Sequence, residues 1–167
     1  REIEISKVSL TGNEELAGAE LKITKGSDET GELVESWTSG KEAEDKNEDG
    51  SAKPHKVKLV AGTYTLSEGK APTGYNTASK ITFTVNLDGT VTSTPADAVS
   101  KDKDGDKTTI TMKDALTERE IEISKVSLTG NEELAGAELK ITKGTDENGE
   151  VVESWTSGKE AEDKNAD

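Results

Sequence analysis

Three ionisable side chains lie in line with the apolar side chains of predicted strands: Lys7, Glu68 and Asp114. Side chains alternate between the two faces of a strand, so every second residue shares a face. Lys7 follows Ile3 and Ile5 on its face, and Asp114 follows Ile110 and Met112. Glu68 follows a longer run on its face: Val60, Gly62, Tyr64 and Leu66. One basic and two acidic groups are therefore predicted to face the core.

A strand that twists out into solvent would explain any one of these charges, but three such cases together favour a buried site. Burying an unpaired charge is costly, so the groups must be paired, neutralised or chemically consumed. A lysine that loses its hydration among apolar neighbours can act as a neutral nucleophile. A carboxylic acid in the same setting stays protonated and electrophilic, while a second carboxyl moves protons. Amide formation would remove both charges.

Eight strand candidates carry these residues, and they predict an all-β sandwich. Alternating, Thr-rich and β-branched segments are separated by clusters of Gly, Asp and Asn. The candidates are 2–10, 18–25, 32–38, 55–60, 62–68, 79–86, 89–94 and 108–116. Turns are predicted at 71–74 and 86–89 and polar loops at 40–54 and 97–107, and no helix is predicted. Short strands with turns between them are typical of a sandwich.

The composition predicts either an unfolded chain or a fold that is stabilised by something other than a large apolar core. Apolar residues make up 29% of the 167 residues and charged residues 34%, a balance typical of disorder. Cysteine is absent, so the disulfides usual in small secreted domains are excluded. The net charge of −14 argues against nucleic acid and against an anionic membrane surface. No apolar run is long enough to insert in a membrane.

The chain repeats itself. Residues 1–49 recur at 119–167, an offset of 118. The four differences are Ser27/Thr145, Thr30/Asn148, Leu33/Val151 and Glu48/Ala166. We interpret 1–118 as a complete module and 119–167 as the first part of a second copy. Tandem copies of one module are more typical of a spacer than of an enzyme.

The sequence resembles the Cna protein B-type family, the SpaA-like, prealbumin-like repeat domains of Gram-positive adhesins and pilins. The segments that carry the resemblance are ISKV (5–8), LAGAEL (16–21), GTYTLSE (62–68), APTGY (71–75), ITFTV (81–85) and ITMKD (110–114). They span essentially all of module one, in the expected order. No LPxTG-type sorting signal and no Tyr-Pro-Lys pilin motif occurs, so we expect neither a wall anchor nor a polymerising pilin backbone in this segment.

The resemblance implies an Ig-like or prealbumin-like sandwich whose first and last strands are parallel neighbours. It implies an isopeptide bond with Lys7 as nucleophile, Asp114 as acceptor and Glu68 as proton shuttle, each acting once rather than as a turnover enzyme. It also implies a cell-wall-attached, extracellular parent protein. The bond would close a loop of roughly 107 residues, worth about 4–5 kcal/mol by the chain-entropy formula.

Lys125 is the repeat equivalent of Lys7, but 119–167 contains no equivalent of Glu68 or Asp114. Reaction with Asp114 of the same chain is geometrically poor, because parallel neighbours need a crossover of about a dozen residues. Two alternatives remain. The second copy is simply cut short, or 119–167 completes residues 50–117 of another molecule in a swapped, cross-linked assembly. We otherwise expect the partners to be neighbouring repeats of the same protein.

Other signals are weaker. Residues 45–50 match the first half of a calcium loop, but the twelfth position is Lys56 where a bidentate Glu is needed, so we predict a solvated turn. His55 is the only histidine and is predicted at a strand edge, which leaves no metal site and no catalytic triad. No phosphate-binding loop follows a strand, so no cofactor is expected. The competing function is a ligand-binding adhesin module for host matrix protein or glycan, but aromatic residues make up only 3%.

Overall fold

The computed structural model describes residues 1–159, and the chain divides into two compact units, Arg1–Glu118 and Arg119–Asp167. We refer to them as unit 1 and unit 2. Within the described residues the regular structure is strand, with two single 3₁₀ turns and no α-helix. The strands of unit 1 are β1 (Glu2–Ser9), β2 (Glu20–Lys25), β3 (Leu33–Thr38), β4 (His55–Lys58), β5 (Gly62–Lys70), β6 (Ile81–Val85), β7 (Val91–Thr94), β8 (Val99–Lys101) and β9 (Thr108–Asp114).

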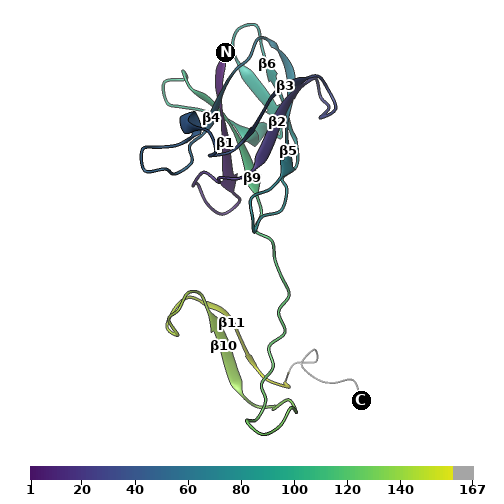
Figure 1. Ribbon diagram of the computed structural model, residues 1–167, viewed down its shortest axis with the longest axis vertical. Helices are drawn as coiled ribbons and strands as arrows, with labels where there is room; N and C mark the ends of the chain where they lie inside the picture. The colour runs from purple at the N-terminus through teal and green to yellow at the C-terminus, as the bar shows by residue number, and fades with distance from the viewer. Residues whose placement is uncertain (160–167) are drawn as a thin grey trace. The chain divides into compact units, whose positions relative to one another are not determined.

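Two sheets form a sandwich in unit 1. The first sheet has the order β4-β1-β9-β8 and the second has the order β3-β2-β5-β6-β7. The first and last strands, β1 and β9, are parallel neighbours, as Figure 1 shows, whereas the other strand pairs are antiparallel. This pairing confirms both the all-β sandwich and the strand arrangement that the resemblance implies.

The core lies between the two sheets. Alternation along each strand places Ile3, Ile5 and Ile110 of the first sheet against Ile23 and Leu66 of the second, and each of these is at most 2% exposed. The ring of Phe83 packs against that of Tyr64, with the centroids 5.6 Å apart. This small core surrounds the three aligned charges, so the same alternation that buries the aliphatic side chains also buries them.

The eight predicted strands agree with the observed ones to within two residues at each end, but one such end and one unpredicted strand change the expected structure. Alternation predicts that Val60 lies on the core face that leads to Glu68, but it is 76% exposed. It lies in the connection between β4 and β5, where the strand period does not apply. The predicted polar loop 97–107 contains the short strand β8, which owes its extended form to pairing with β9, with Val99 opposite Ile110.

Unit 2 contains one hairpin in its described part. Strands β10 (Glu138–Thr142) and β11 (Val151–Thr156) pair with the register of β2 and β3, including the same irregularity after the fourth pair. Residues 120–127, the equivalent of β1, form no strand. Their sequence matches that of 2–9, so the difference must come from the missing neighbours β4 and β9 rather than from local preference.

Candidate cross-linking site

The structure brings Lys7, Glu68 and Asp114 together between the two sheets. Lys7 comes from β1 and Asp114 ends β9, both in the first sheet, while Glu68 comes from β5 in the second. Their side chains are almost fully buried, with 1% of Lys7 exposed and none of Glu68 or Asp114. Lys7 Nζ contacts Asp114 Oδ1 and lies 3.2 Å from Glu68 Oε1.

The strand register explains how Lys7 reaches Asp114. In the parallel pair Lys7 is level with Met112, and Asp114 is level with Ser9, two residues further along. Alternation keeps Met112 and Asp114 on one face, so the long lysine side chain can extend along the strand to the carboxyl group. The juxtaposition therefore depends on one register, because a slip of one residue would move Asp114 to the opposite face.

The site carries one ammonium and two carboxyl groups in an apolar setting. Burial raises the pKa of the Glu68 carboxyl, the nearby Asp114 charge raises it further, and the hydrogen bond from Ala78 and the charge of Lys7 lower it less than burial raises it. Ala78 N donates to Glu68 Oε2 at 2.7 Å, which fixes the carboxyl. Asp114 Oδ2 is buried without a hydrogen-bond partner in the described residues, and Glu68 Oε1 is buried with only its ion pair to Lys7 Nζ. Buried charges with unsatisfied oxygens destabilise the folded state, and this penalty would be removed if Lys7 and Asp114 lost their charges.

The sequence did not point to the residues that hold this site in place. Ala78 acts through its main-chain N–H, which no sequence pattern reports. Glu15 contacts the main chain of Lys7 from a polar loop that has no apolar period. The only signal available for Glu15 was its position just before the LAGAEL segment (16–21).

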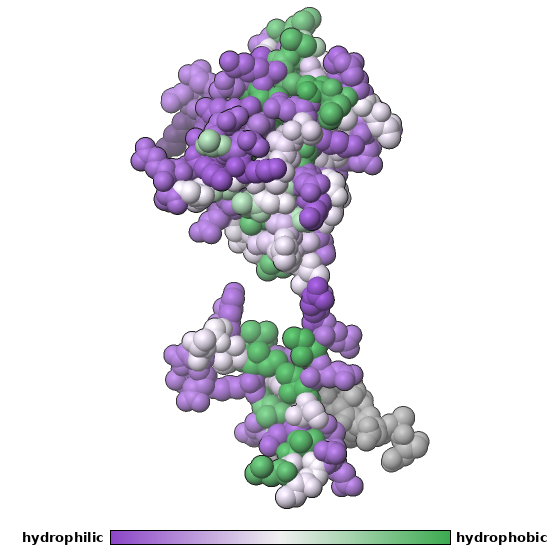
Figure 2. Space-filling model, in the orientation of Figure 1, coloured by the Kyte–Doolittle hydropathy of each residue, from purple (hydrophilic) through white to green (hydrophobic). Residues whose placement is uncertain are grey.

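Lys125 lies apart from any such arrangement. It is exposed and belongs to no strand. The apolar residues beside it are also exposed: Ile121 is 77% and Ile123 is 52% exposed, whereas their equivalents Ile3 and Ile5 are 0% and 2% exposed. Figure 2 shows hydrophobic side chains at the surface of unit 2.

His55 and Asp45 form a second buried polar cluster. His55 lies on β4, an edge strand as predicted, but only 8% of it is exposed. Its Nδ1 lies 2.9 Å from Asp45 Oδ2, its Nε2 lies 3.0 Å from Glu35 Oε1, and its ring stacks on Trp37. The prediction of a solvated turn is wrong for Asp45, which is 1% exposed because this imidazole binds it, whereas Asp49 is exposed.

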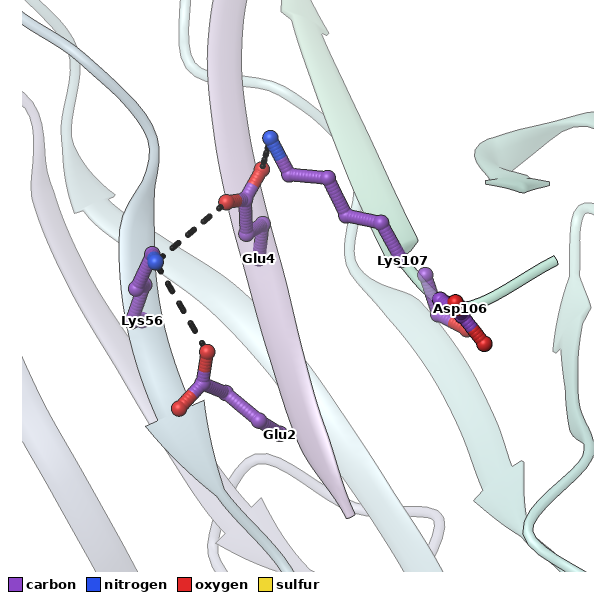
Figure 3. A pocket seen from close by; sticks show the side chains of 6 residues that line it. Glu2, Glu4, Lys56, Asp106 and Lys107 are labelled. Atoms are coloured by element: carbon purple, nitrogen blue, oxygen red, sulfur yellow. Dashed lines mark ion pairs between the residues drawn. The ribbon is translucent and has the colours of Figure 1, made fainter. Parts of the chain in front are cut away.

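An open, charged hollow lies on the outer face of the first sheet. Figure 3 shows Glu4 between two lysines, with Lys107 Nζ at 2.8 Å and Lys56 Nζ at 3.9 Å. These ion pairs join β1 to β4, through Lys56, and to the residue that precedes β9, Lys107. Within residues 1–159, no cluster of three or more His, Cys, Asp or Glu side chains is arranged to hold a metal ion. The same residues contain no helix long and apolar enough to cross a membrane.

Unit 1 is therefore an all-β sandwich whose terminal strands β1 and β9 are parallel neighbours, with a buried Lys–Glu–Asp group between its sheets. The family model of the SpaA prealbumin-like fold domain matches residues 1–99, and the chain belongs to that family. No curated protein matches it.

Several solved structures are similar to the chain. The Bacillus anthracis TIE protein is 27% identical, with a TM-score of 0.51 over 93% of this chain and 24% of its own. A C-terminal fragment of the pilus adhesin SpaC from Lactobacillus rhamnosus GG is 26% identical, with a TM-score of 0.49 over 72% of this chain and 46% of its own. The pilus-presented adhesin Cpa is 27% identical, with a TM-score of 0.42 over 55% of this chain and 18% of its own. The chain thus spans less than half the length of each.

Proposed function

We propose that this chain is a structural stalk repeat of a bacterial cell-surface adhesin, closed by an isopeptide bond between Lys7 and Asp114 with the help of Glu68. The observation that carries the proposal is the buried contact of Lys7 Nζ with Asp114 beside Glu68, on parallel neighbouring strands. Membership of the SpaA prealbumin-like family supports it. An extracellular location on the bacterial surface follows from the same proposal.

The bond forms by condensation of an amine with a carboxylic acid. Neutral Lys7 Nζ attacks Cγ of protonated Asp114, and a C–N bond forms as one C–O bond breaks. Glu68 takes a proton from the attacking nitrogen and delivers it to the departing hydroxyl, which leaves as water. The raised pKa of Glu68 suits a group that must both accept and release a proton. The product is a neutral amide, so neither buried charge persists.

The bond gives the module a direct path for tension. Force that enters at the start of β1 passes from Lys7 through the amide to Asp114, the last residue of β9. Residues 8–113 lie outside that path and carry no load. Only residues 115–118 separate Asp114 from unit 2 along the chain, so few residues outside the linked pair would bear the tension within unit 1. These are the properties of a spacer that resists extension.

Intact-mass measurement of the 167-residue chain tests the bond. We expect a mass lower than that of the unlinked sequence by about 18 Da, the mass of one water. Lys7→Ala, Asp114→Ala and Glu68→Ala should each lack this deficit. The masses are compared for the monomer, where Lys125→Ala is the matched control and should retain the deficit, because Lys125 has the same local sequence as Lys7 but lies outside the buried site of unit 1. A native chain of full mass would refute the proposed function.

The structure favours the stalk over the competing ligand-binding module. Recognition of a matrix protein or a glycan by such a module needs exposed aromatic or apolar surface. Trp37, Tyr64 and Phe83 are buried in unit 1, and the larger part of its surface in Figure 2 is polar. We therefore propose no ligand site.

We further propose that unit 2 associates with residues 50–117 of another copy of the chain. In unit 1 the equivalents of its exposed residues are covered by β4, β5 and β9, all of which come from that segment. Association competes with residues 1–49 of the acceptor chain and places Lys125 beside the acceptor's Asp114. Denaturing electrophoresis should show a covalent dimer that Lys125→Ala abolishes. Monomer alone in the native chain would refute the swapped assembly and leave the intramolecular bond untouched.

A further inference from the structure

The main chain of Lys7 is held from two sides. On one side β9 pairs with β1 along the stretch from Glu4 to Ser9. On the other side β4 pairs with β1 only as far as Ile5, so it stops two residues before the lysine. The loop after β1 takes its place. Lys7 N donates to Glu15 Oε2 at 2.8 Å, and Lys7 O accepts a hydrogen bond from Leu16 N at 2.6 Å.

Glu15 contacts β1 at a second point. Its other carboxyl oxygen, Oε1, accepts a hydrogen bond from Ser6 Oγ. One carboxylate therefore holds two consecutive residues of the strand, the main chain of Lys7 and the side chain of Ser6. We refer to Ser6, Lys7, Glu15 and Leu16 as the loop clamp. A bidentate contact of this kind restricts both the translation and the rotation of the strand at the residue that must react.

The same clamp is present in unit 2, where nothing else in the described residues holds the segment in a sheet. Lys125 N donates to Glu133 Oε2 at 2.9 Å, Ser124 Oγ donates to Glu133 Oε1, and Leu134 N donates to Lys125 O at 2.7 Å. Residues 120–127 form no strand there, and Lys125 is exposed. The clamp is therefore a product of the local sequence and does not need the sandwich. Contacts only eight or nine residues apart form early, because the loop that they close is short.

We propose that Glu15 is a positioning residue for the cross-link, which fixes the main chain at Lys7 so that Nζ meets Asp114 when β9 docks. This inference rests on the proposed isopeptide bond. It assigns no proton transfer to Glu15, which touches the main chain of Lys7 and not its reacting nitrogen.

The expected effect follows from the length of the lysine side chain. A free lysine side chain samples many rotamers, and only those that extend along the strand reach Asp114. When the main chain of Lys7 is fixed, the extended rotamers of its side chain place Nζ at the carboxyl group of Asp114. Intramolecular reactions of this kind lose about a hundredfold in rate for a misplacement of roughly 1 Å. Removal of the clamp leaves β9 in place, so we expect a smaller loss, on the order of tenfold.

Time-resolved mass measurement after cell-free synthesis of the full chain tests the proposal. Synthesis sets time zero, and acid quenching at intervals gives the fraction that has lost about 18 Da. Glu15→Ala should slow this loss on the order of tenfold while amide hydrogen exchange shows that unit 1 folds at the native rate. Glu15→Gln should react at nearly the native rate, because an amide oxygen still accepts from Lys7 N. Glu133→Ala removes the identical clamp from unit 2 and should leave the rate unchanged.

The outcomes separate the two proposals. If the native chain loses no mass, the isopeptide bond itself is refuted. If the native chain and Glu15→Ala lose mass at the same rate, Glu15 is not a positioning residue, although the bond stands. If Glu15→Ala slows folding and bond formation equally, its role is structural and the inference is overturned. If Glu15→Ala does not fold, Glu15→Met decides the matter, because it keeps a side chain of similar length but has no oxygen to accept from Lys7 N. Slower mass loss with native folding supports the inference, and an unchanged rate overturns it.

Discussion

Replacement of Glu68 by glutamine isolates the contribution of the proposed bond to stability. The glutamine would keep the shape of the side chain, and its amide oxygen can still accept the hydrogen bond from Ala78 N. It cannot shuttle a proton between Lys7 and Asp114, so the chain folds without the isopeptide bond. The comparison therefore removes the covalent link and leaves the strands, the register and the aliphatic core as they are.

The magnitude follows from the separation of the linked residues. Lys7 and Asp114 are 107 positions apart. A cross-link that closes a loop of this length stabilises the folded state by about 5 kcal/mol in the chain-entropy model. For a unit of this size, each kcal/mol shifts the midpoint of thermal unfolding by about 3–5 °C. Glu68→Gln should therefore unfold about 15–25 °C below the native chain.

Thermal unfolding followed by far-ultraviolet circular dichroism measures this difference, with intact mass recorded on the same samples. Unit 2 contributes equally to both chains, so the difference reports on unit 1. Lys125→Ala should unfold at the native temperature. A Glu68→Gln chain that has lost the mass deficit but unfolds within a few degrees of the native chain would contradict the entropic account. A chain that keeps the deficit would contradict the role of Glu68.

Two further predictions concern polar groups outside the cross-linking site, the half-buried Glu15 and the buried His55. Burial raises the pKa of the Glu15 carboxyl above its ordinary value of 4.5. Between pH 4.5 and the pKa of the folded state, the folded chain therefore binds more protons than the unfolded chain. The contribution of Glu15 to the free energy of unfolding falls as the pH rises through this window. Denaturant titrations from about pH 4 to 8 should show the native chain losing stability relative to Glu15→Gln over this window, and a flat or opposite difference would contradict this. His55→Phe should keep the stacking on Trp37 but leave Asp45 buried without its imidazole partner. We expect the free energy of unfolding, measured by denaturant titration, to fall by about 2–4 kcal/mol. A fall of less than about 1 kcal/mol would contradict a stabilising role for this pair.

The parts of the structure that follow from alternation could be predicted from the sequence. Lys7, Glu68 and Asp114 each continue a run of buried side chains within one strand, so period two alone placed them in the core. The same rule failed at Val60, because the face was extended past the end of the strand. β8 was missed because its three residues have no pattern of their own and become a strand by pairing with β9.

The polar contacts could not be predicted, because they depend on where the loops fold back. Asp45 lies in an acidic segment whose composition predicts a solvated loop, yet it is buried against His55, ten positions away. Glu15 is one of several acidic residues in a polar loop, and its position beside Lys7 depends on the path of that loop. Charge and polarity in a sequence identify groups that need partners, but the choice of partner belongs to tertiary structure.

The repeat separates local from long-range determinants within one molecule. The hairpin and the loop clamp recur in unit 2, so they need only nearby residues. The first strand does not recur, since Ile121 is 77% exposed where Ile3 is fully buried, so it needs β4 and β9. Asp114 is the last residue of the last strand of unit 1, and it reaches Lys7 only when β9 has paired with β1. The proposed bond therefore cannot guide the fold; it forms on the completed sandwich and prevents it from opening.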